Sequence, residues 1–193
     1  MILHYLVFSA MTAAVLLLAS GGIDSTALMD FYLRRQVNLK CIHFQYGQSN
    51  AQSEAEAIEK VSEYYHIQKR VIRLDFPLMR RKDELVGRNA IFVLAASGLE
   101  APPVRIALGI HSGSQYYDCS KLFMDDCQRI LDGYFGGSMR LEAPFLSFRK
   151  LDIMRYCKAN NVPTHLTYSC QKQNYPPCGK CASCLDREEL FGC

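Results

Sequence analysis

The sequence predicts an α/β fold in which helices cover both faces of a doubly wound, mostly parallel sheet. One reason is the order of the expected elements: strand and helix alternate from residue 15 to residue 74, and such units cross over right-handedly. Another is the apolar run at residues 15–19, which is typical of a strand buried on both faces of a parallel sheet. The third is the glycine turn at residues 20–25, which joins that strand directly to a helix.

The other elements follow from two patterns: apolar runs predict strands, and apolar residues at helical spacing predict helices. The expected strands after the first are residues 39–46, 69–74, 104–108 and 139–143. The expected helices are residues 26–35, 49–65, 90–97, a helix that opens at residues 118–119, and residues 149–160. Residues 75–86 carry a basic run at positions 80–82 and are expected to form a loop.

Two of these helices carry expectations about burial. Residues 90–97 are apolar on nearly every side, which is typical of a buried helix. In the helix that follows residue 119, the side chains expected to face the core are Leu122, Phe123, Cys127 and Ile130.

Length and composition limit the class of protein. A chain of 193 residues fits one domain, residues 1–193, with a sizeable core. Hydrophobic content of 49% and charged content of 21% are ordinary for a globular protein. The net charge is only +3, so the general electrostatic footprint of a nucleic-acid-binding protein is absent and no direct nucleic-acid binding is expected.

The first nineteen residues are strongly apolar but do not read as a targeting segment. They lack the basic start of a signal peptide and are short for a membrane span, so we expect no membrane association. A leading segment with a strand at residues 2–8 is expected, and Met11 is an alternative start. Nine cysteines, four of them clustered near the C-terminus, indicate metal binding in a reducing, cytoplasmic setting rather than a disulfide framework.

The turn at residues 20–25 reads Ser-Gly-Gly-Ile-Asp-Ser and is a candidate phosphate site. Gly21 and Gly22 permit backbone angles closed to other residues and let a ligand approach the main chain. Ser20, Asp24 and Ser25 are residues of the kind that cap helices. The amides and dipole of the helix that begins here favour a phosphate, although the Gly-Lys-Ser/Thr of a Walker loop is absent. The plain alternative is an ordinary turn.

Further polar residues are expected at the same edge of the sheet. The loop after residue 108 lies beyond the carboxyl end of its strand, where ligands bind in doubly wound sheets. Asp118 at the end of this loop is a candidate ligand-binding residue, and its plain alternative is a cap for the following helix. Arg88 lies at the start of another expected helix. Burying its charged side chain there would be costly unless it binds an anion such as a phosphate or carboxylate of a ligand. The alternative is that Arg88 forms a salt bridge within the protein.

The second strong signal is a cysteine cluster within residues 165–187. Cys170, Cys178, Cys181 and Cys184 have the spacing Cys-x7-Cys-x2-Cys-x2-Cys, which lets turns present four thiolates to one tetrahedral ion. Zinc is the preferred ion, and an iron–sulfur cluster is the alternative. The remaining candidates, Cys41, Cys127 and Cys157, are expected to be buried, inert thiols.

Taken together, these motifs resemble the 7-cyano-7-deazaguanine synthase family of PP-loop ATP pyrophosphatases, from about residue 15 to residue 187. The resemblance rests on the segments at residues 20–25, 44–48 with Glu54, 87–89, 118–119, 143–145 with Lys150, and 169–184. It implies an adenine nucleotide alpha hydrolase-like fold. It also implies conversion of 7-carboxy-7-deazaguanine to the nitrile with ATP and ammonia, through an acyl-adenylate and an amide, by an enzyme of the C–N ligase type.

The resemblance also implies site residues and cofactors. The catalytic residues would be Asp24, Ser25 and Lys150. The ATP-binding residues would be Ser20, Gly21, Gly22, Ile23, Asp24, Ser25 and Arg88. The residues for the deazaguanine acid would be Asp118, Asn89 and Gln48. The implied cofactors are ATP, Mg²⁺ and a Zn²⁺ held by the four clustered cysteines, and the implied assembly is a homodimer.

The sequence departs from the family in one loop, which leaves other functions open. Family members usually carry an Asn and a longer Gly-Tyr-Pro-Asp-Cys loop after the fourth strand, whereas residues 109–119 are shorter and lack the Pro. A divergent paralogue could pass the activated acid to another amine, even one on a protein. A catalytically silent nucleotide-binding scaffold and a tRNA-thiolating relative are further alternatives; the absence of an appended RNA-binding domain argues against the last.

Overall fold

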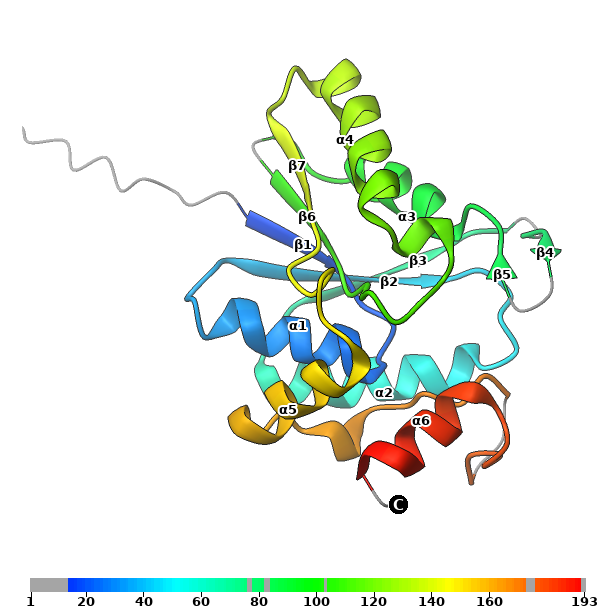
Figure 1. Ribbon diagram of the computed structural model, residues 1–193. Helices are drawn as coiled ribbons and strands as arrows, with labels where there is room; N and C mark the ends of the chain where they lie inside the picture. Colours follow the sequence, from blue (N-terminus) through cyan, green and yellow to red (C-terminus); the bar gives the residue numbers. More distant parts are fainter. Residues whose placement is uncertain (1–13, 76–77, 82–83, 103, 173–175, 192–193) are drawn as a thin grey trace, which may run out of the picture.

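A computed structural model describes residues 14–75, 78–81, 84–102, 104–172 and 176–191. Its centre is a five-stranded parallel sheet in the order β3-β2-β1-β6-β7 (Figure 1). The strands are β1 (Ala14–Leu18), β2 (Leu39–Gln45), β3 (Lys69–Arg73), β6 (Val104–Leu108) and β7 (Met139–Glu142). The doubly wound parallel fold predicted from the sequence is therefore confirmed. The strand expected at residues 2–8 lies outside the described residues.

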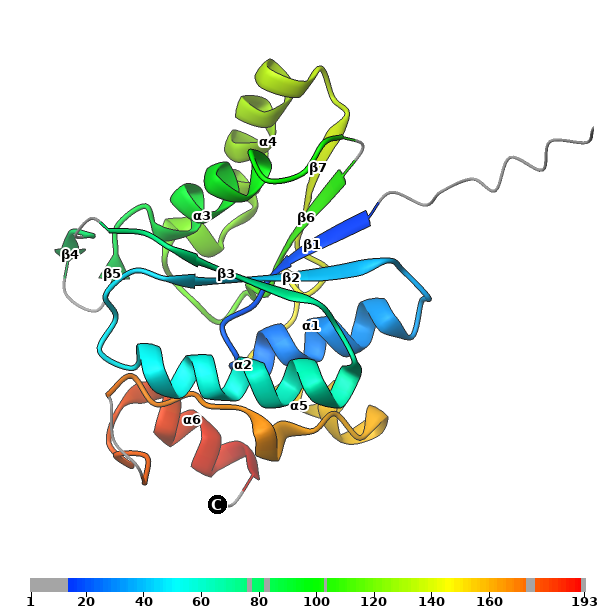
Figure 2. The same ribbon diagram turned by 180° about the vertical axis from the view of Figure 1, so that it is seen from behind.

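Helices cover both faces of this sheet, as Figures 1 and 2 show from opposite sides. On one face lie α1 (Ile23–Leu33), α2 (Ala51–Tyr65), α5 (Lys150–Asn160) and, further out, α6 (Ala182–Phe191). On the other face lie α3 (Arg88–Ser97) and α4 (Lys121–Phe135). Short 3-10 turns occupy η1 (Tyr117–Cys119) and η2 (Thr164–Leu166). Within the described ranges, no helix is long and apolar enough to cross a membrane.

The alternation of side chains along β1 explains why its sequence is continuously apolar. Val15 and Leu17 enter the core beneath α1, α2 and α5, whereas Leu16 and Leu18 enter the core beneath α3 and α4. Each of these leucines is at most 9% exposed. Because successive side chains of a strand point to opposite faces, a central strand covered on both sides needs apolar residues at every position.

Two expectations about helices and one about a loop were wrong. In α4, Leu122 is 60% and Ile130 is 44% exposed, because the buried stripe instead passes through Phe123, Met124, Cys127 and Leu131. In α3, Leu94 is 41% exposed and only Asn89, Val93, Ala96 and Ser97 are fully buried, so this helix is not buried on every side. The segment expected to be a loop contains the small hairpin β4 (Arg80–Arg81) and β5 (Glu84–Leu85).

The order in which the chain forms the strands places a topological switch point beside β1. The chain builds β1, β2 and β3 outward in one direction, and then returns to place β6 and β7 on the other side of β1. At such a point the loops that leave the carboxyl ends of neighbouring strands diverge and open a crevice. The turn after β1 and the loop after β6 therefore face each other across the place where a ligand is expected.

Candidate functional site

The glycine turn after β1 is shaped by close packing against α2. Gly21 has φ +78°, and a Cβ there would meet the carbonyl oxygen of Glu54 and the amide nitrogen of Ile58 at 2.9 Å each. A side chain is therefore excluded by both the backbone angle and the neighbouring helix. The Gly21 carbonyl accepts a hydrogen bond from the Tyr168 amide (3.0 Å), which ties the turn to the C-terminal segment.

Serine hydroxyls hold the start of α1 in a way that differs from the expected caps. The helix begins at Ile23, with Gly22 in extended conformation at the N-cap position and no side chain capping it. The Ser25 hydroxyl donates to the Gly22 carbonyl (3.1 Å), and its oxygen lies 3.3 Å from the Ser20 amide nitrogen, which donates to it. The expectation that Ser20, Asp24 or Ser25 caps α1 was therefore wrong, because the helix starts before two of them.

Asp24 and Lys150 form an ion pair at this edge of the sheet. Lys150 Nζ lies 2.6 Å and 2.7 Å from the two carboxylate oxygens of Asp24. His111 Nε2 lies 3.9 Å from the same carboxylate, and His111 Nδ1 accepts a hydrogen bond from the Gly113 amide (3.0 Å). Burial lowers the pKa of His111; the carboxylate of Asp24 opposes this effect and the cation of Lys150 adds to it. A cation, a carboxylate and an imidazole thus meet beside the turn.

A second polar group lies where the loop after β6 meets α3. Asp118 is 6% exposed, and its carboxylate lies 3.4 Å from the Asn89 amide nitrogen, which donates to it. The Asn89 side-chain amide donates to the Asp118 carbonyl (3.0 Å). Ser120, not Asp118, caps the following helix, because its hydroxyl oxygen accepts from the Phe123 amide (3.1 Å). Asp118 therefore contacts the first turn of α3 rather than its own helix.

Arg88 lies at the same junction with anionic and phenolic partners. Burial lowers its pKa, but Tyr46, Asp118 and Glu54 more than offset this effect, and the pKa of Arg88 is raised above its ordinary value. Its positive charge is therefore retained within the site. Internal partners and an external anion are compatible here, since an Arg guanidinium carries five N–H donors.

Gln48 is held by the partly buried carboxylate of Glu54, one of the residues on which the family resemblance rests. Its side-chain amide donates to Glu54 (2.9 Å), and its carbonyl oxygen accepts from the Tyr46 amide (2.8 Å). The Asn50 side chain also donates to Glu54 (3.0 Å). Burial raises the pKa of Glu54, and these donors oppose the rise. Glu54 thus organises the loop after β2 at the edge of the site.

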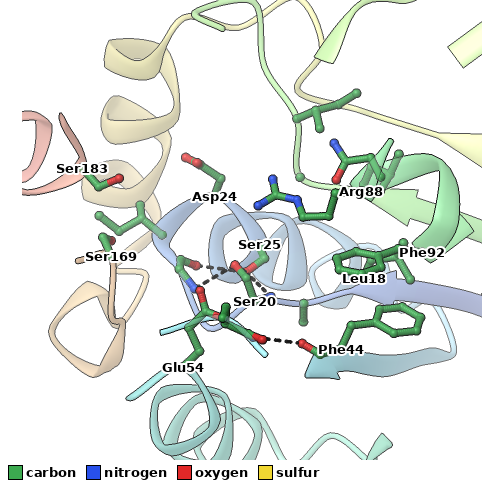
Figure 3. Close-up of a pocket in the computed structure, with 18 of the residues that line it drawn as sticks. Leu18, Ser20, Asp24, Ser25, Phe44, Glu54, Arg88, Phe92, Ser169 and Ser183 are labelled. Atoms are coloured by element: carbon green, nitrogen blue, oxygen red, sulfur yellow. Dashed lines mark hydrogen bonds between the residues drawn. The ribbon is translucent and has the colours of Figure 1, made fainter. Parts of the chain in front are cut away.

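One pocket of about 480 Å³ connects these groups. Nearly all the sequence-predicted ligand residues line it: Ser20, Gly22, Ile23, Asp24, Ser25, Gln48, Arg88, Asn89, Asp118 and Lys150. Gly21 is not among the lining residues, because it faces α2. Figure 3 shows the side chain of Arg88 pointing into the same space as Asp24 and Ser25, with Leu18, Phe44 and Phe92 gathered at one end.

The C-terminal segment supplies a wall of this pocket that the sequence did not reveal. Ser169, Ser183, Asp186 and Arg187 all line it, and Figure 3 shows Ser169 and Ser183 at the end away from Phe44 and Phe92. These residues have no motif spacing of their own. Their placement follows from the cysteine cluster, which folds the chain on either side of them against α2 and the turn.

The four clustered cysteines fit a single metal ion. The sulfur atoms of Cys170, Cys178, Cys181 and Cys184 all lie within 4.8 Å of one another. A tetrahedral ion bound by thiolates at about 2.3 Å separates the sulfurs by about 3.8 Å. The amides of Lys172 and Cys178 donate to the Cys170 sulfur (3.4 Å each). Amide donors lower the pKa of Cys178 to about 6, which favours the thiolate form that metals require.

The three remaining expected thiols are buried. Cys41, Cys127 and Cys157 are at most 4% exposed, as predicted. Burial raises the pKa of Cys41 and of Cys157 to about 12, so both remain neutral thiols at neutral pH. Their lack of reactivity remains a prediction.

The fold and the glycine turn define a protein of the PP-loop ATP pyrophosphatase class. Its structure resembles the U34-tRNA thiolase NcsA from Methanococcus maripaludis with its [4Fe-4S] cluster, with a TM-score of 0.51 and 15% identity. The match covers 93% of this chain and 65% of the thiolase chain, so this chain spans somewhat less than two thirds of that protein. At this identity the likeness concerns the fold alone.

The chain belongs to the family described as Queuosine biosynthesis protein QueC, whose model matches residues 13–86 and 80–192. A 7-cyano-7-deazaguanine synthase from Sulfurihydrogenibium sp. (strain YO3AOP1) is 29% identical over 209 residues, which cover 92% of this chain and 93% of the relative. The 7-cyano-7-deazaguanine synthase 2 of Desulfitobacterium hafniense (strain Y51) is also 29% identical, covering 94% of this chain and 89% of the relative. The predicted family resemblance is therefore confirmed.

Proposed function

We propose that the protein activates 7-carboxy-7-deazaguanine with ATP and converts the activated acid with ammonia to 7-cyano-7-deazaguanine. The observation that carries this proposal is the single pocket lined both by the turn at residues 20–25 and by Asp118. Family membership supports it, because the relatives matched over almost their whole length are named for making this product.

The chemistry requires one site to bind the acid and the α-phosphate of ATP together. A carboxylate is a poor electrophile, so its oxygen attacks the α-phosphorus and pyrophosphate departs. Ammonia then displaces AMP to give the amide. A second activation, on the amide oxygen, lets that oxygen leave with AMP and gives the nitrile. Holding the reacting groups in one pocket removes most of the entropic cost of bringing them together.

The phosphate end of the pocket is proposed at the start of α1. The helix N-terminus and turn would stabilise charge on the departing pyrophosphate, with Ser20, Ser25 and the Lys150–Asp24 pair positioned there. Arg88 retains its positive charge and would meet phosphate or carboxylate oxygens. Mg²⁺ prefers oxygen ligands, and the Asp24 carboxylate, which is paired with Lys150 in this structure, would supply one at this end.

The base is proposed to bind beside Asp118. A carboxylate matches the two adjacent N–H donors of a guanine-type ring, and Asp118 is held in place by Asn89. Gln48, fixed by Glu54, would contact the ligand from the β2 side. The apolar end formed by Leu18, Phe44 and Phe92 suits a flat ring, and the two phenylalanines are themselves stacked with centroids 4.4 Å apart.

Zinc is proposed as the ion of the cysteine cluster. Four sulfurs within 4.8 Å can surround one ion, whereas a [4Fe–4S] cluster places each thiolate on a different iron and needs wider spacing. Zinc there would hold Ser183, Asp186 and Arg187 against the pocket.

The direct test is pyrophosphate release by the purified protein with ATP and 7-carboxy-7-deazaguanine, each also omitted in turn. Release that requires both ligands supports the proposal. A protein that binds ATP without turnover would be a nucleotide-binding scaffold, and the proposal would be wrong.

A further inference from the structure

His111 is an imidazole at the phosphate end of the pocket that the proposed chemistry leaves without a role. It lies in the loop after β6 and lines the pocket. Its side chain is 18% exposed, so a ligand in the pocket can reach the ring. The charged groups that act on the ring are Asp24 at the start of α1, Lys150 at the start of α5 and Asp186 in α6.

The loop that carries His111 is held close to the start of α1. A Cβ at Gly109 would lie 3.2 Å from the Ser25 amide nitrogen, so the backbone of the loop touches the first turn of this helix. On the other side, the amide and the hydroxyl of Ser112 both donate to the Phe148 carbonyl, at 2.9 Å and 2.7 Å. His111 is therefore fixed at the helix end whose amides and dipole favour a phosphate.

The Gly113 amide determines which ring nitrogen carries the proton. A backbone N–H can only donate a hydrogen bond, so Nδ1 of His111, 3.0 Å from the Gly113 nitrogen, accepts it and carries no proton. The proton of the ring is then on Nε2, which is a donor. The missing side chain of Gly113 permits this contact, because a Cβ there would lie 2.9 Å from the ring atoms Nδ1 and Cε1.

The Nε2–H group has no hydrogen-bond acceptor among the described residues. The Asp24 carboxylate is 3.9 Å from Nε2, which is too long for a hydrogen bond. Both oxygens of this carboxylate accept instead from Lys150, at 2.6 Å and 2.7 Å. Nε2 is not one of the sealed, unpartnered side-chain atoms of the described ranges, so it is open to the pocket. An accessible donor beside a cation points to an anionic ligand.

We infer that Nε2 of His111 donates a hydrogen bond to a phosphate oxygen of ATP. The ring lies beside the Lys150–Asp24 pair and the first turn of α1, which is the end of the pocket proposed above for the phosphates. This inference therefore rests on the proposed function. The carboxylate of the deazaguanine acid is the other anion expected in the pocket, and the experiment separates the two.

Two substitutions separate the donor from the contact with Gly113. In His111→Asn the side-chain carbonyl oxygen takes about the place of Nδ1 and still accepts from the Gly113 amide, but the donor at Nε2 is lost. In His111→Gln the longer side chain places an amide donor near the position of Nε2. His165→Asn, at an exposed histidine that does not line the pocket, is the matched control.

Calorimetric titrations with ATP, AMP and 7-carboxy-7-deazaguanine test the inference. We expect His111→Asn to bind ATP about 10–100-fold more weakly, as for one lost hydrogen bond to a charged group, with partial recovery in His111→Gln and no change in His165→Asn. Weaker AMP binding would assign the oxygen to the α-phosphate, and unchanged AMP binding to the β- or γ-phosphate. Unchanged ATP affinity, or a loss confined to the acid, would overturn the inference.

A second variant displaces the ring without altering it. In Gly113→Ala the new Cβ would meet Nδ1 and Cε1 of His111 at 2.9 Å, so the ring has to move. ATP binding should weaken as it does in His111→Asn. Gly133→Ala, where a Cβ meets nothing within 4 Å, is the control and should bind ATP as the parent does. Imidazole ¹⁵N NMR of the unmodified protein should show the proton on Nε2 and its signal shifted by ATP; a proton on Nδ1 would contradict the inference.

The plain alternative is that His111 acts only by orienting Asp24. Titration of ATP into Asp24→Ala, and into the double variant that also carries His111→Asn, distinguishes the two roles. If Nε2 contacts a phosphate, the second substitution weakens ATP binding further, whereas equal affinities in the single and double variants would overturn the inference. A parent that binds no ATP would contradict both the inference and the proposed function, and a parent that binds ATP without releasing pyrophosphate would contradict the proposed function alone.

Discussion

Lys150 Nζ lies 2.6 Å from Asp24 Oδ1 and 2.7 Å from Asp24 Oδ2, although 126 positions of sequence separate the two residues. Lys150 is the first residue of α5 and Asp24 lies in the first turn of α1, so the pair joins two helices beside the phosphate end of the pocket. Both side chains are about a quarter exposed, and both residues line the pocket.

We predict that Lys150→Met and Asp24→Ala each lower ATP-dependent pyrophosphate release by about 10²–10³-fold, because each removes charge where charge develops in the reaction. Lys158→Met, on the exposed surface of the same helix, is the control and should keep full turnover. The melting temperature, measured by circular dichroism, should change little in all three variants. Full turnover in either site variant would count against the assigned phosphate end.

Two neighbouring hydroxyls provide a sharper comparison. Ser25 and Thr26 both donate to the Gly22 carbonyl, at 3.1 Å and 2.9 Å, but only Ser25 lines the pocket. Ser25→Ala should abolish pyrophosphate release. Thr26→Val should lower the free energy of unfolding by about 1 kcal/mol and leave turnover intact. Urea unfolding and a turnover assay on both variants measure this, and matching turnover losses would mean that the hydroxyls act only by shaping the helix start.

The role of Asp118 can be separated from helix capping. Asp118→Ala should weaken binding of 7-carboxy-7-deazaguanine much more than binding of ATP, because the N–H donors of the base lose their acceptor. Ser120→Ala removes the true cap of α4 and should cost about 1 kcal/mol of stability without altering acid affinity. Calorimetric titrations of both ligands, set beside melting temperatures, compare the two. Unchanged acid affinity in Asp118→Ala would exclude it from base recognition.

We predict that loss of the metal at the cysteine cluster also disturbs the ligand pocket, because α6 contributes to both. Cys181→Ser should lower zinc content and melting temperature together, since structural zinc contributes directly to folding. It should also weaken ligand binding, because Asp186 and Arg187 line the pocket. Cys157→Ala, at a buried thiol outside the cluster, should lower stability alone. Elemental analysis decides the metal: iron with sulfide, or a folded protein without metal, would contradict this prediction.

Much of the fold could be predicted because its signals are local. The buried strand, the glycine turn and the cysteine spacing are each contained in a few residues, and alternation of elements then determines the parallel sheet. The buried face of α4 could not be predicted from the sequence. Its residues Leu122, Phe123, Met124 and Ile130 are all apolar, and only tertiary packing decides which of them are buried. The apolar spacing likewise did not locate the start of α1, which was expected at residue 26 and lies at Ile23.

The site was predictable only where a motif marked it. The turn residues and Asp118 were singled out by position, and the structure places them around one pocket. Ser183, Asp186 and Arg187 carry no such mark, because they reach the pocket only through long-range packing of the C-terminal segment.

We propose that the protein converts a deazaguanine acid into its nitrile at the expense of ATP. The most direct measurement is the mass of the product formed from 7-carboxy-7-deazaguanine and ATP, with ¹⁵N-ammonium supplied or withheld. We expect a nitrile that carries the labelled nitrogen, formed only when ammonium is present, and pyrophosphate released in step with it. A product bearing a different amine, or an unmodified acid despite pyrophosphate release, would contradict it.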